Sequence, residues 1–149
     1  MMVSIQVNGQ KFEVSIREDE FLLDTLRAIG VKSVKRGCET TSCGMCSVIV
    51  DGRLVNSCAY LTLRANNKSV LTVEGLGDEG DRIAHYLTNE GVEQCGYCSP
   101  GFVMAVYQMK RDLSDFTEEN VKHYLAGNLC RCSGYEGQHR GIMAYLEVK

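Results

Sequence analysis

The sequence predicts an α+β protein, with strands in its first half and helices in its second half. Between residues 3 and 73, short segments alternate apolar with polar side chains and are separated by Asn-Gly or Asp-Gly pairs, which is typical of β-hairpins. After residue 74, apolar side chains recur every three or four positions, which indicates helices. A chain of 149 residues, 44% of them hydrophobic, can form one compact domain or two small ones.

The first predicted elements are a hairpin and a helix. Residues 3–7 and 12–16 alternate apolar with polar side chains on either side of Asn8-Gly9, a pair that suits the positive φ angles of a tight turn. Leucine and isoleucine side chains at helical spacing then predict a helix over 22–29, and Gly30 stands where a helix usually ends.

A second hairpin and a fifth strand follow. Residues 48–50 and 54–55 flank Asp51-Gly52, and residues 70–73 form one more short apolar run. The order hairpin, helix, hairpin, strand resembles that of a β-grasp ferredoxin.

The second half contains four segments with helical spacing, which predict a small helical bundle. They lie around residues 83–87, 102–109, 121–125 and 142–146. Ser99, followed by Pro100, is predicted to cap the second helix, and Thr117, followed by two glutamates, is predicted to cap the third.

The boundary between the two halves is expected at a group of glycines. Gly75, Gly77 and Gly80 interrupt both the strand pattern and the helix pattern. We therefore expect one domain over residues 1–76 and a second over residues 77–149.

Eight cysteines are the unusual part of the composition. The N-terminal residues show no basic start followed by an apolar block, so we expect no secretory signal and a cytoplasmic protein. Disulfides are rare in a reducing compartment, and cysteines in tight clusters are therefore interpreted as metal ligands.

The first cysteine group has four, two and eleven residues between its successive members. It consists of Cys38, Cys43, Cys46 and Cys58. Its opening matches the C-x4-C-x2-C spacing by which plant-type ferredoxins hold a 2Fe-2S cluster in one loop. Gly37 and Gly44 allow the backbone to curl so that its amides face the sulfurs.

The second group joins a C-x2-C pair and a C-x-C pair across 31 residues. It consists of Cys95, Cys98, Cys130 and Cys132. Two pairs at two helix ends can clamp one cluster, and the helix that begins beside Cys98 is expected to favour its thiolate. For either group the alternative is a structural zinc site with four cysteines, which would carry out no redox chemistry.

Several functions are disfavoured by the sequence. A net charge of −3 without a basic stripe argues against a nucleic acid partner. The longest apolar run, residues 101–109, is about half of a membrane span, so we expect no membrane insertion. We find no nucleophile with a partner base and no paired carboxylates, so we assign no catalytic residue to this chain and expect substrate conversion elsewhere.

Four sequence blocks carry a resemblance to a known family. They are Ser33-Val34-Lys35-Arg36-Gly37-Cys38, Cys43-Gly44-Met45-Cys46-Ser47-Val48, Gln94-Cys95-Gly96-Tyr97-Cys98-Ser99-Pro100-Gly101 and Gly127-Asn128-Leu129-Cys130-Arg131-Cys132-Ser133-Gly134-Tyr135. Over essentially its whole length the chain resembles the small iron-sulfur subunit of the molybdenum hydroxylases, the xanthine dehydrogenase and aldehyde oxidoreductase family.

The resemblance implies a fold, cofactors and partners. It implies an N-terminal β-grasp domain and a C-terminal four-helix domain, each with one 2Fe-2S cluster. It also implies that electrons leave a molybdenum-pterin centre in a large subunit, pass the helical-domain cluster and then the ferredoxin-like cluster, and usually reach FAD in a third subunit. Gln94 and Cys132 match positions that approach the pterin in the family, although the sequence alone does not separate this role from a solvated one for Gln94.

Two alternatives and two departures accompany this resemblance. The alternatives are an independent two-cluster ferredoxin that serves another dehydrogenase, and a zinc-stabilised binding module. The substrate stays open, because purines, aldehydes, nicotinate and carbon monoxide are all handled with this kind of small subunit, and a purine such as xanthine is preferred on resemblance only. The departures are Thr41, where the family often has glycine, and Gln138, beside Gly137, where an apolar residue is common.

Overall fold

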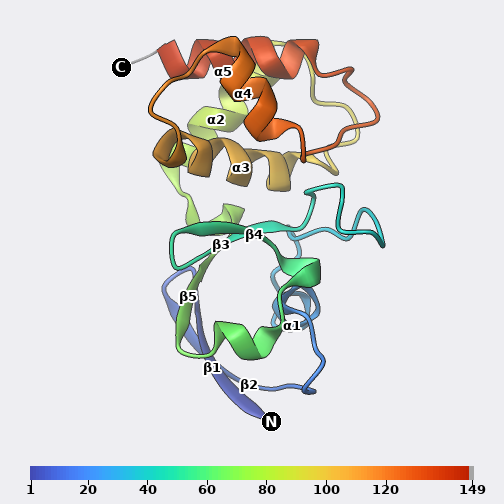
Figure 1. The fold of residues 1–149 in the computed structure, drawn as a ribbon, viewed down its shortest axis with the longest axis vertical. Helices are drawn as coiled ribbons and strands as arrows, with labels where there is room; N and C mark the ends of the chain where they lie inside the picture. The colour runs from blue at the N-terminus through green and yellow to red at the C-terminus, as the bar shows by residue number, and fades with distance from the viewer. Residues whose placement is uncertain (148–149) are drawn as a thin grey trace.

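The computed structural model describes residues 1–147 as a sheet half and a helical half stacked along the long axis of the molecule (Figure 1). The elements of the first half are β1 (Met2–Val7), β2 (Gln10–Ser15), α1 (Leu22–Ala28), β3 (Ser47–Val50), β4 (Arg53–Asn56) and β5 (Lys68–Leu71). The sheet has the strand order β2-β1-β5-β3-β4, in which β1 and β5 are parallel and the other neighbours are antiparallel. The predicted α+β class is confirmed.

Both predicted hairpins are present, and their turns have the expected backbone. Asn8 and Gly9 have φ angles of 50° and 84°, and Asp51 and Gly52 have φ angles of 46° and 79°. Positive φ at both central residues gives a turn whose twist matches that of the flanking strands. Helix α1 ends as predicted, because Gly30 follows it with a φ of 102°.

The fifth strand is earlier than predicted: it covers Lys68–Leu71 rather than residues 70–73. The side chain of Asn8 explains the difference. Its Oδ1 accepts from Thr72 N at 2.9 Å, and its Nδ2 donates to Thr72 Oγ1 at 2.8 Å. These bonds replace the ladder at Thr72, and the chain continues into a 3-10 turn over Val73–Gly75.

The second half contains the four predicted helices. They are α2 (Asp78–Asn89), α3 (Ser99–Asp112), α4 (Glu118–Leu125) and α5 (Glu136–Glu147). Their apolar faces meet in one core that includes Ile83, Val106, Val121 and Ile142, each at most 1% exposed. The sheet half has its own core, in which the leucines of α1 pack against β1, β3 and β5.

Two glycines bring α5 close to α2 and to the segment that follows α2. A Cβ atom at Gly141 would lie 2.8 Å from the Tyr86 carbonyl oxygen, and one at Gly137 would collide with the Val92 side chain. Helix α5 is continuous through Gln138, so this departure from the family does not interrupt the last helix. The neighbouring Gly137 leaves room for the Val92 side chain.

The two predicted helix caps have different outcomes. Thr117 caps α4 as predicted, since its Oγ1 accepts from Asn120 N at 3.3 Å. The prediction for Ser99 is wrong: Ser99 is the first residue of α3, and its hydroxyl donates to the Glu93 carboxylate at 3.0 Å instead. Pro100 occupies the first turn of α3, as expected.

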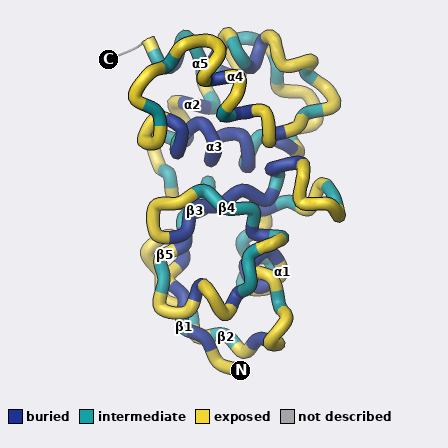
Figure 2. The backbone as a smooth tube through the Cα atoms, in the orientation of Figure 1, coloured by how far each residue is buried: buried dark blue, intermediate teal, exposed yellow. Residues whose placement is uncertain are grey.

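The two halves are packed together along α3, which is largely buried between the sheet and the other helices (Figure 2). Gly101 touches the loop before β3 so closely that an added Cβ would lie 2.9 Å from Met45 Cα. Asn128 is buried there and donates Nδ2 to the carbonyl oxygens of Gly44 at 3.3 Å and Gly101 at 3.4 Å. The backbone of Gly101 therefore lies directly against the backbone of Gly44 and Met45, which leaves little room for a larger residue at Gly101.

Candidate metal centres

The first cysteine group lies on one loop and one short turn of the sheet half. Cys38, Cys43 and Cys46 belong to the loop between α1 and β3, and Cys58 lies on the 3-10 turn that follows β4. Ser57 fastens the turn to the loop, because both its N (3.2 Å) and its Oγ (2.7 Å) donate to the Cys46 carbonyl oxygen. Residues far apart in the sequence are thereby brought to one place.

The loop takes two left-handed residues to curl around this site. Gly44 has a φ of 69°, and Thr41 has a φ of 60°. This conformation is easy for glycine and strained for a β-branched residue. Thr41, one of the two departures from the family, therefore adopts the backbone that glycine would adopt with less strain.

The sulfurs of the first group are arranged in two pairs. The thiol of Cys43 interacts directly with that of Cys38, and the thiol of Cys58 interacts directly with that of Cys46. Cys38 and Cys58, one from each pair, interact at longer range.

The thiols of this group differ in acidity. The pKa of Cys38 is lowered to about 6, chiefly by the backbone N–H of Thr40, with further help from the Cys43 side chain and the N–H groups of Cys43 and Ser42. Burial is the main reason that the pKa of Cys43 is raised and that the pKa of Cys58 rises to about 11. Cys38 is thus a ready thiolate near neutral pH, whereas the buried thiols need a bound metal to lose their protons.

The second cysteine group is drawn from two turns of the helical half. Cys95 and Cys98 lie just before α3, and Cys130 and Cys132 lie between α4 and α5. Cys132 Sγ is 3.7 Å from Cys95 Sγ, and the thiol of Cys98 interacts directly with that of Cys130. The second group therefore has the same two-and-two arrangement as the first.

The sulfur separation in the second group suits metal binding. A disulfide would place the sulfurs about 2.05 Å apart, and all eight cysteines of the described chain are free. Two thiolates on one tetrahedral metal, with bonds of about 2.3 Å, lie about 3.8 Å apart. The 3.7 Å between Cys95 and Cys132 is close to that value.

Backbone N–H groups surround one sulfur of the second group. Cys132 N and Ser133 N both lie 3.4 Å from Cys130 Sγ. Burial opposes ionisation of Cys130, but these bonds and the Ser133 side chain outweigh it, so its pKa is lowered.

The expectation that a helix N-terminus favours the Cys98 thiolate is wrong for the metal-free thiol. Cys98 is the N-terminal flanking residue of α3, but it is buried, and burial raises its pKa to about 12. The cost of removing a charged sulfur from water exceeds the gain from the helix dipole.

The two groups differ in their exposure. In the first group Cys43 and Cys46 are buried and the other two are partly buried, whereas in the second group Cys95 and Cys132 are exposed. Gln94, the residue before Cys95, donates Nε2 to the Cys132 carbonyl oxygen at 3.0 Å. The structure thus brings together Gln94 and Cys132, the two residues for which the resemblance implies an approach to the pterin, and that role stays a prediction.

A direct contact between the two ligand loops was not predicted from the sequence. Leu129 N donates to the Cys43 carbonyl oxygen at 2.8 Å, so a neighbour of Cys130 is bonded to a member of the first group. Asn128 supports this contact, and Tyr97 adds a second one by donating its hydroxyl to the Arg36 carbonyl oxygen at 3.0 Å. Tyr97, Asn128 and Leu129 stand inside the cysteine-containing blocks of the sequence. That position does not reveal a contact such as the one between Asn128 and Gly44, which are 84 positions apart.

Within the described residues, no helix is long and apolar enough to cross a membrane. In the same range, no three cysteine, histidine, aspartate or glutamate side chains gather as they would around a single ion. The arrangement seen in both cysteine groups is the paired one.

Comparisons with known proteins agree with this arrangement. Residues 5–72 match the 2Fe-2S iron-sulfur cluster binding domain family, and residues 72–143 match the 2Fe-2S binding domain family. The chain is 37% identical to the xanthine dehydrogenase iron-sulfur-binding subunit of Escherichia coli O157:H7, over 90% of this chain and 87% of the relative. It is 32% identical to the nicotinate dehydrogenase small FeS subunit of Eubacterium barkeri, over 97% and 94%.

A solved structure extends the agreement to three dimensions. The crystal structure of quinoline 2-oxidoreductase from Pseudomonas putida 86 superposes with a TM-score of 0.88 and 31% identity, over 95% of this chain and 90% of the matched chain. Relatives of this identity that are matched over most of their length share a family as well as a fold. The chain therefore belongs to the family of small 2Fe-2S subunits of the xanthine dehydrogenase-type molybdenum hydroxylases.

Proposed function

We propose that the eight cysteines hold two 2Fe-2S clusters and that the chain carries electrons for a molybdenum hydroxylase. Cys38, Cys43, Cys46 and Cys58 would hold one cluster, and Cys95, Cys98, Cys130 and Cys132 the other. The observation that carries the proposal is the arrangement of both groups as two pairs of sulfurs. A two-iron cluster needs two thiolates at each iron, whereas a single zinc ion needs four thiolates around one point.

The residues around the sulfurs suit a negatively charged group. When bound, a 2Fe-2S cluster takes up and releases one electron at a time. The chain supplies backbone N–H groups toward Cys38 and Cys130, which offset the negative charge of the thiolates. The bond from Leu129 N to the Cys43 carbonyl oxygen holds the two ligand loops in a fixed relation.

The exposed pair of the second group indicates how the chain meets its partner. Members of this family serve beside a larger molybdenum subunit, and Cys95 and Cys132 are the exposed cysteines. We infer that this surface faces the molybdenum subunit and that Gln94 and Cys132 approach its pterin. Gln94 is held for such a contact by its bond to the Cys132 carbonyl oxygen.

The other end of the electron path is proposed at the first group. Phe21 and Arg36 line a hollow beside Cys38 and Cys58, and Phe21 is exposed. We propose that this face meets a subunit that carries FAD, that the complex is cytoplasmic, and that residues 1–76 and 77–149 are the two cluster-binding domains. The relatives are named for xanthine, nicotinate and quinoline, so we propose that the large subunit selects the substrate, with a purine as the first to test.

Iron analysis and electron paramagnetic resonance of the anaerobically purified protein test the proposal. We expect about four irons per chain and two distinguishable signals after full reduction. Cys38→Ser should alter one signal and Cys95→Ser the other, because the two ligands belong to different groups. A colourless protein with zinc, or a single signal that both variants alter, would contradict it.

Native purification separates the two electron-transfer hypotheses. Co-purification with a large molybdenum-pterin chain is the expected result. Isolation of the chain alone, with both clusters and no partner, would favour the independent ferredoxin.

A further inference from the structure

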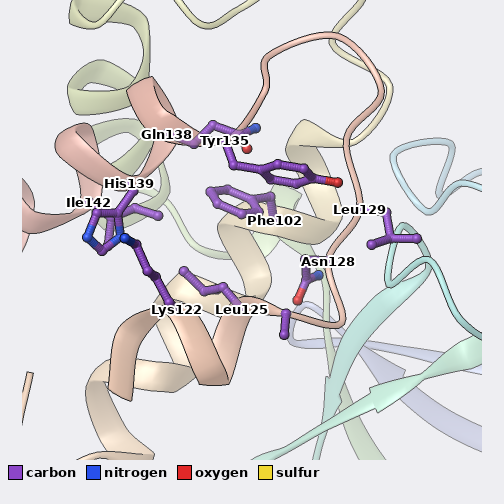
Figure 3. Close-up of a pocket in the computed structure, with 10 residues that line it drawn as sticks. Phe102, Lys122, Leu125, Asn128, Leu129, Tyr135, Gln138, His139 and Ile142 are labelled. Carbon is purple, nitrogen blue, oxygen red and sulfur yellow. The ribbon is translucent and has the colours of Figure 1, made fainter. Parts of the chain in front are cut away.

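The side-chain amide of Gln138 is buried beside apolar side chains. It lies in the first turn of α5, is 5% exposed, and lines a groove together with Phe102, Tyr135 and Ile142 (Figure 3). Within the described residues, its Oε1 is the buried side-chain oxygen that has no hydrogen-bond partner. Burying an unpaired amide oxygen costs folding free energy, and an apolar side chain at this position would avoid that cost.

The other end of the same amide faces a cysteine of the second group. Gln138 Nε2 lies 4.0 Å from Cys98 Sγ, at the long end of an N–H···S contact. Cys98 is the buried member of this group, so its sulfur is far less accessible to water than those of Cys95 and Cys132. An amide N–H is therefore the polar group that the fold offers to this sulfur from α5.

The orientation of the amide suits a charged sulfur. A thiolate would attract the Nε2 hydrogens and repel Oε1, so a metal-bound Cys98 would favour the orientation seen here. In that orientation Oε1 is directed away from the sulfur and stays unpaired. The unpaired oxygen is thus the consequence of presenting the N–H to Cys98.

We propose that Gln138 raises the reduction potential of the helical-domain cluster by donating its Nε2–H to the Cys98 sulfur, an inference that rests on the proposed cluster at Cys95, Cys98, Cys130 and Cys132. Reduction adds one electron, and the sulfurs become more negative while the amide keeps both its hydrogens. A hydrogen bond to a ligand sulfur stabilises this more negative state. Gln138 is therefore a positioning residue that acts through Cys98.

Gln138→Met removes the N–H and keeps a side chain of similar length. A potentiometric titration followed by paramagnetic resonance, on the native complex, measures both clusters in one sample. We expect the signal that Cys95→Ser identifies as the helical-domain cluster to become about fivefold harder to reduce, a fall of about 40 mV at about 59 mV per tenfold change. The other signal should keep its potential.

Gln108→Met is the matched control. Gln108 is also buried, at 3% exposed, but its Nε2 donates to the Gly52 carbonyl oxygen at 3.0 Å and to Asp112 Oδ1 at 2.6 Å. We expect neither potential to move in this variant. An equal shift of both clusters in Gln138→Met, or the same shift in Gln108→Met, would overturn the proposal.

A second readout detects the bond itself. With nitrogen-15 in the glutamine side chains, a hyperfine coupling from the amide should appear at the helical-domain cluster of the wild type and of Gln108→Met. The part of the coupling that comes from Gln138 should be lost in Gln138→Met, and in Gln138→Leu as a second apolar variant, whereas any part from Gln94, which is bonded to Cys132, should remain. If both clusters are present, but their potentials are the same in Gln138→Met as in the wild type and no coupling from Gln138 is seen, the proposed role of Gln138 is wrong and the proposed function stands. If the protein contains no paramagnetic clusters after reduction, the proposed function itself is wrong.

Discussion

The two cysteine groups have the same paired arrangement but are held in different ways. The first lies on the loop before β3 and the turn after β4, and the loop packs against α3 and Asn128, so its shape depends on contacts between the two halves. The second is drawn from two turns of the helical half, and Cys95 and Cys132 of this group are exposed. The shape of the first site is therefore determined by packing, whereas part of the second site is exposed. Variants and reagents that act on only one of the two sites test this difference.

The largest expected difference is in thiol reactivity of the metal-free protein. The pKa of Cys38 is lowered to about 6 and that of Cys98 is raised to about 12, so at pH 7 Cys38 is mostly thiolate and Cys98 is almost entirely thiol. Since the thiolate is the nucleophile, iodoacetamide should modify Cys38 at least about a hundredfold faster, after allowance for the lower nucleophilicity of a more acidic thiol. Peptide mass spectrometry over time gives both rates.

The pH dependence gives the control for this experiment. The Cys38 rate should fall as the pH drops below about 6, because its thiolate is then protonated, and it should be nearly constant from pH 7 to 8. Circular dichroism should show that the helices persist without metal. Equal rates for Cys38 and Cys98 in the folded protein would contradict the contrast in their surroundings.

The next effect is at the contact between the halves. Gly101→Ala places a Cβ 2.9 Å from Met45 Cα, and backbone atoms on both sides leave little room to adjust. We expect a loss of about 1–3 kcal/mol in the free energy of unfolding. The cluster of the first group should also be altered, because the displaced segment carries Cys43 and Cys46.

Gly127→Ala is the matched control for Gly101→Ala. An added Cβ at Gly127 meets no atom within 4 Å. Chemical denaturation and the visible spectrum should therefore be close to those of the wild type. If Gly101→Ala were equally mild, the close packing of the first site would not determine its shape.

The local parts of the structure could be predicted from the sequence, and the reason is physical. Asn8-Gly9 and Asp51-Gly52 specify their turns through backbone preference alone, and the periodicity of the helices reflects one buried face. The division of the cysteines into two groups of four also follows from their spacing, and the structure brings the members of each group together. Their role as ligands stays a prediction, which iron analysis and paramagnetic resonance of the cysteine variants test.

The parts that could not be predicted depend on contacts between distant segments. The end of β5 is decided by the Asn8 side chain, which reaches Thr72 across 64 positions. Burial overrides the helix dipole at Cys98, and no pattern in the sequence states how deep that sulfur lies. The sequence predicts Ser99 as a cap because its pattern places the start of α3 one residue later than the structure does.

A smaller effect is expected from the buried amide that joins the halves. Asn128→Ala removes the two bonds to the Gly44 and Gly101 carbonyl oxygens, and should lower the free energy of unfolding by about 1–2 kcal/mol. Asn89→Ala, in the last turn of α2 with an exposed side chain, serves as control and should cost little. A loss no greater than that of the control would show that Leu129 and Gly101 suffice to hold the first loop.

The smallest effect distinguishes the two buried glutamines by stability. Gln108→Met leaves the Gly52 carbonyl oxygen and Asp112 Oδ1 without this donor, although Asp112 Oδ2 still accepts from Tyr124, and should cost about 1 kcal/mol in the free energy of unfolding. Gln138→Met removes an amide oxygen that has no partner together with the N–H that faces Cys98, so a gain and a loss offset each other and its cost should be well below that of Gln108→Met. Denaturant titration of both metal-loaded variants measures the difference. A loss in Gln138→Met as large as that in Gln108→Met would mean that the Gln138 amide stabilises the fold. The contrast between the two glutamines would then be wrong.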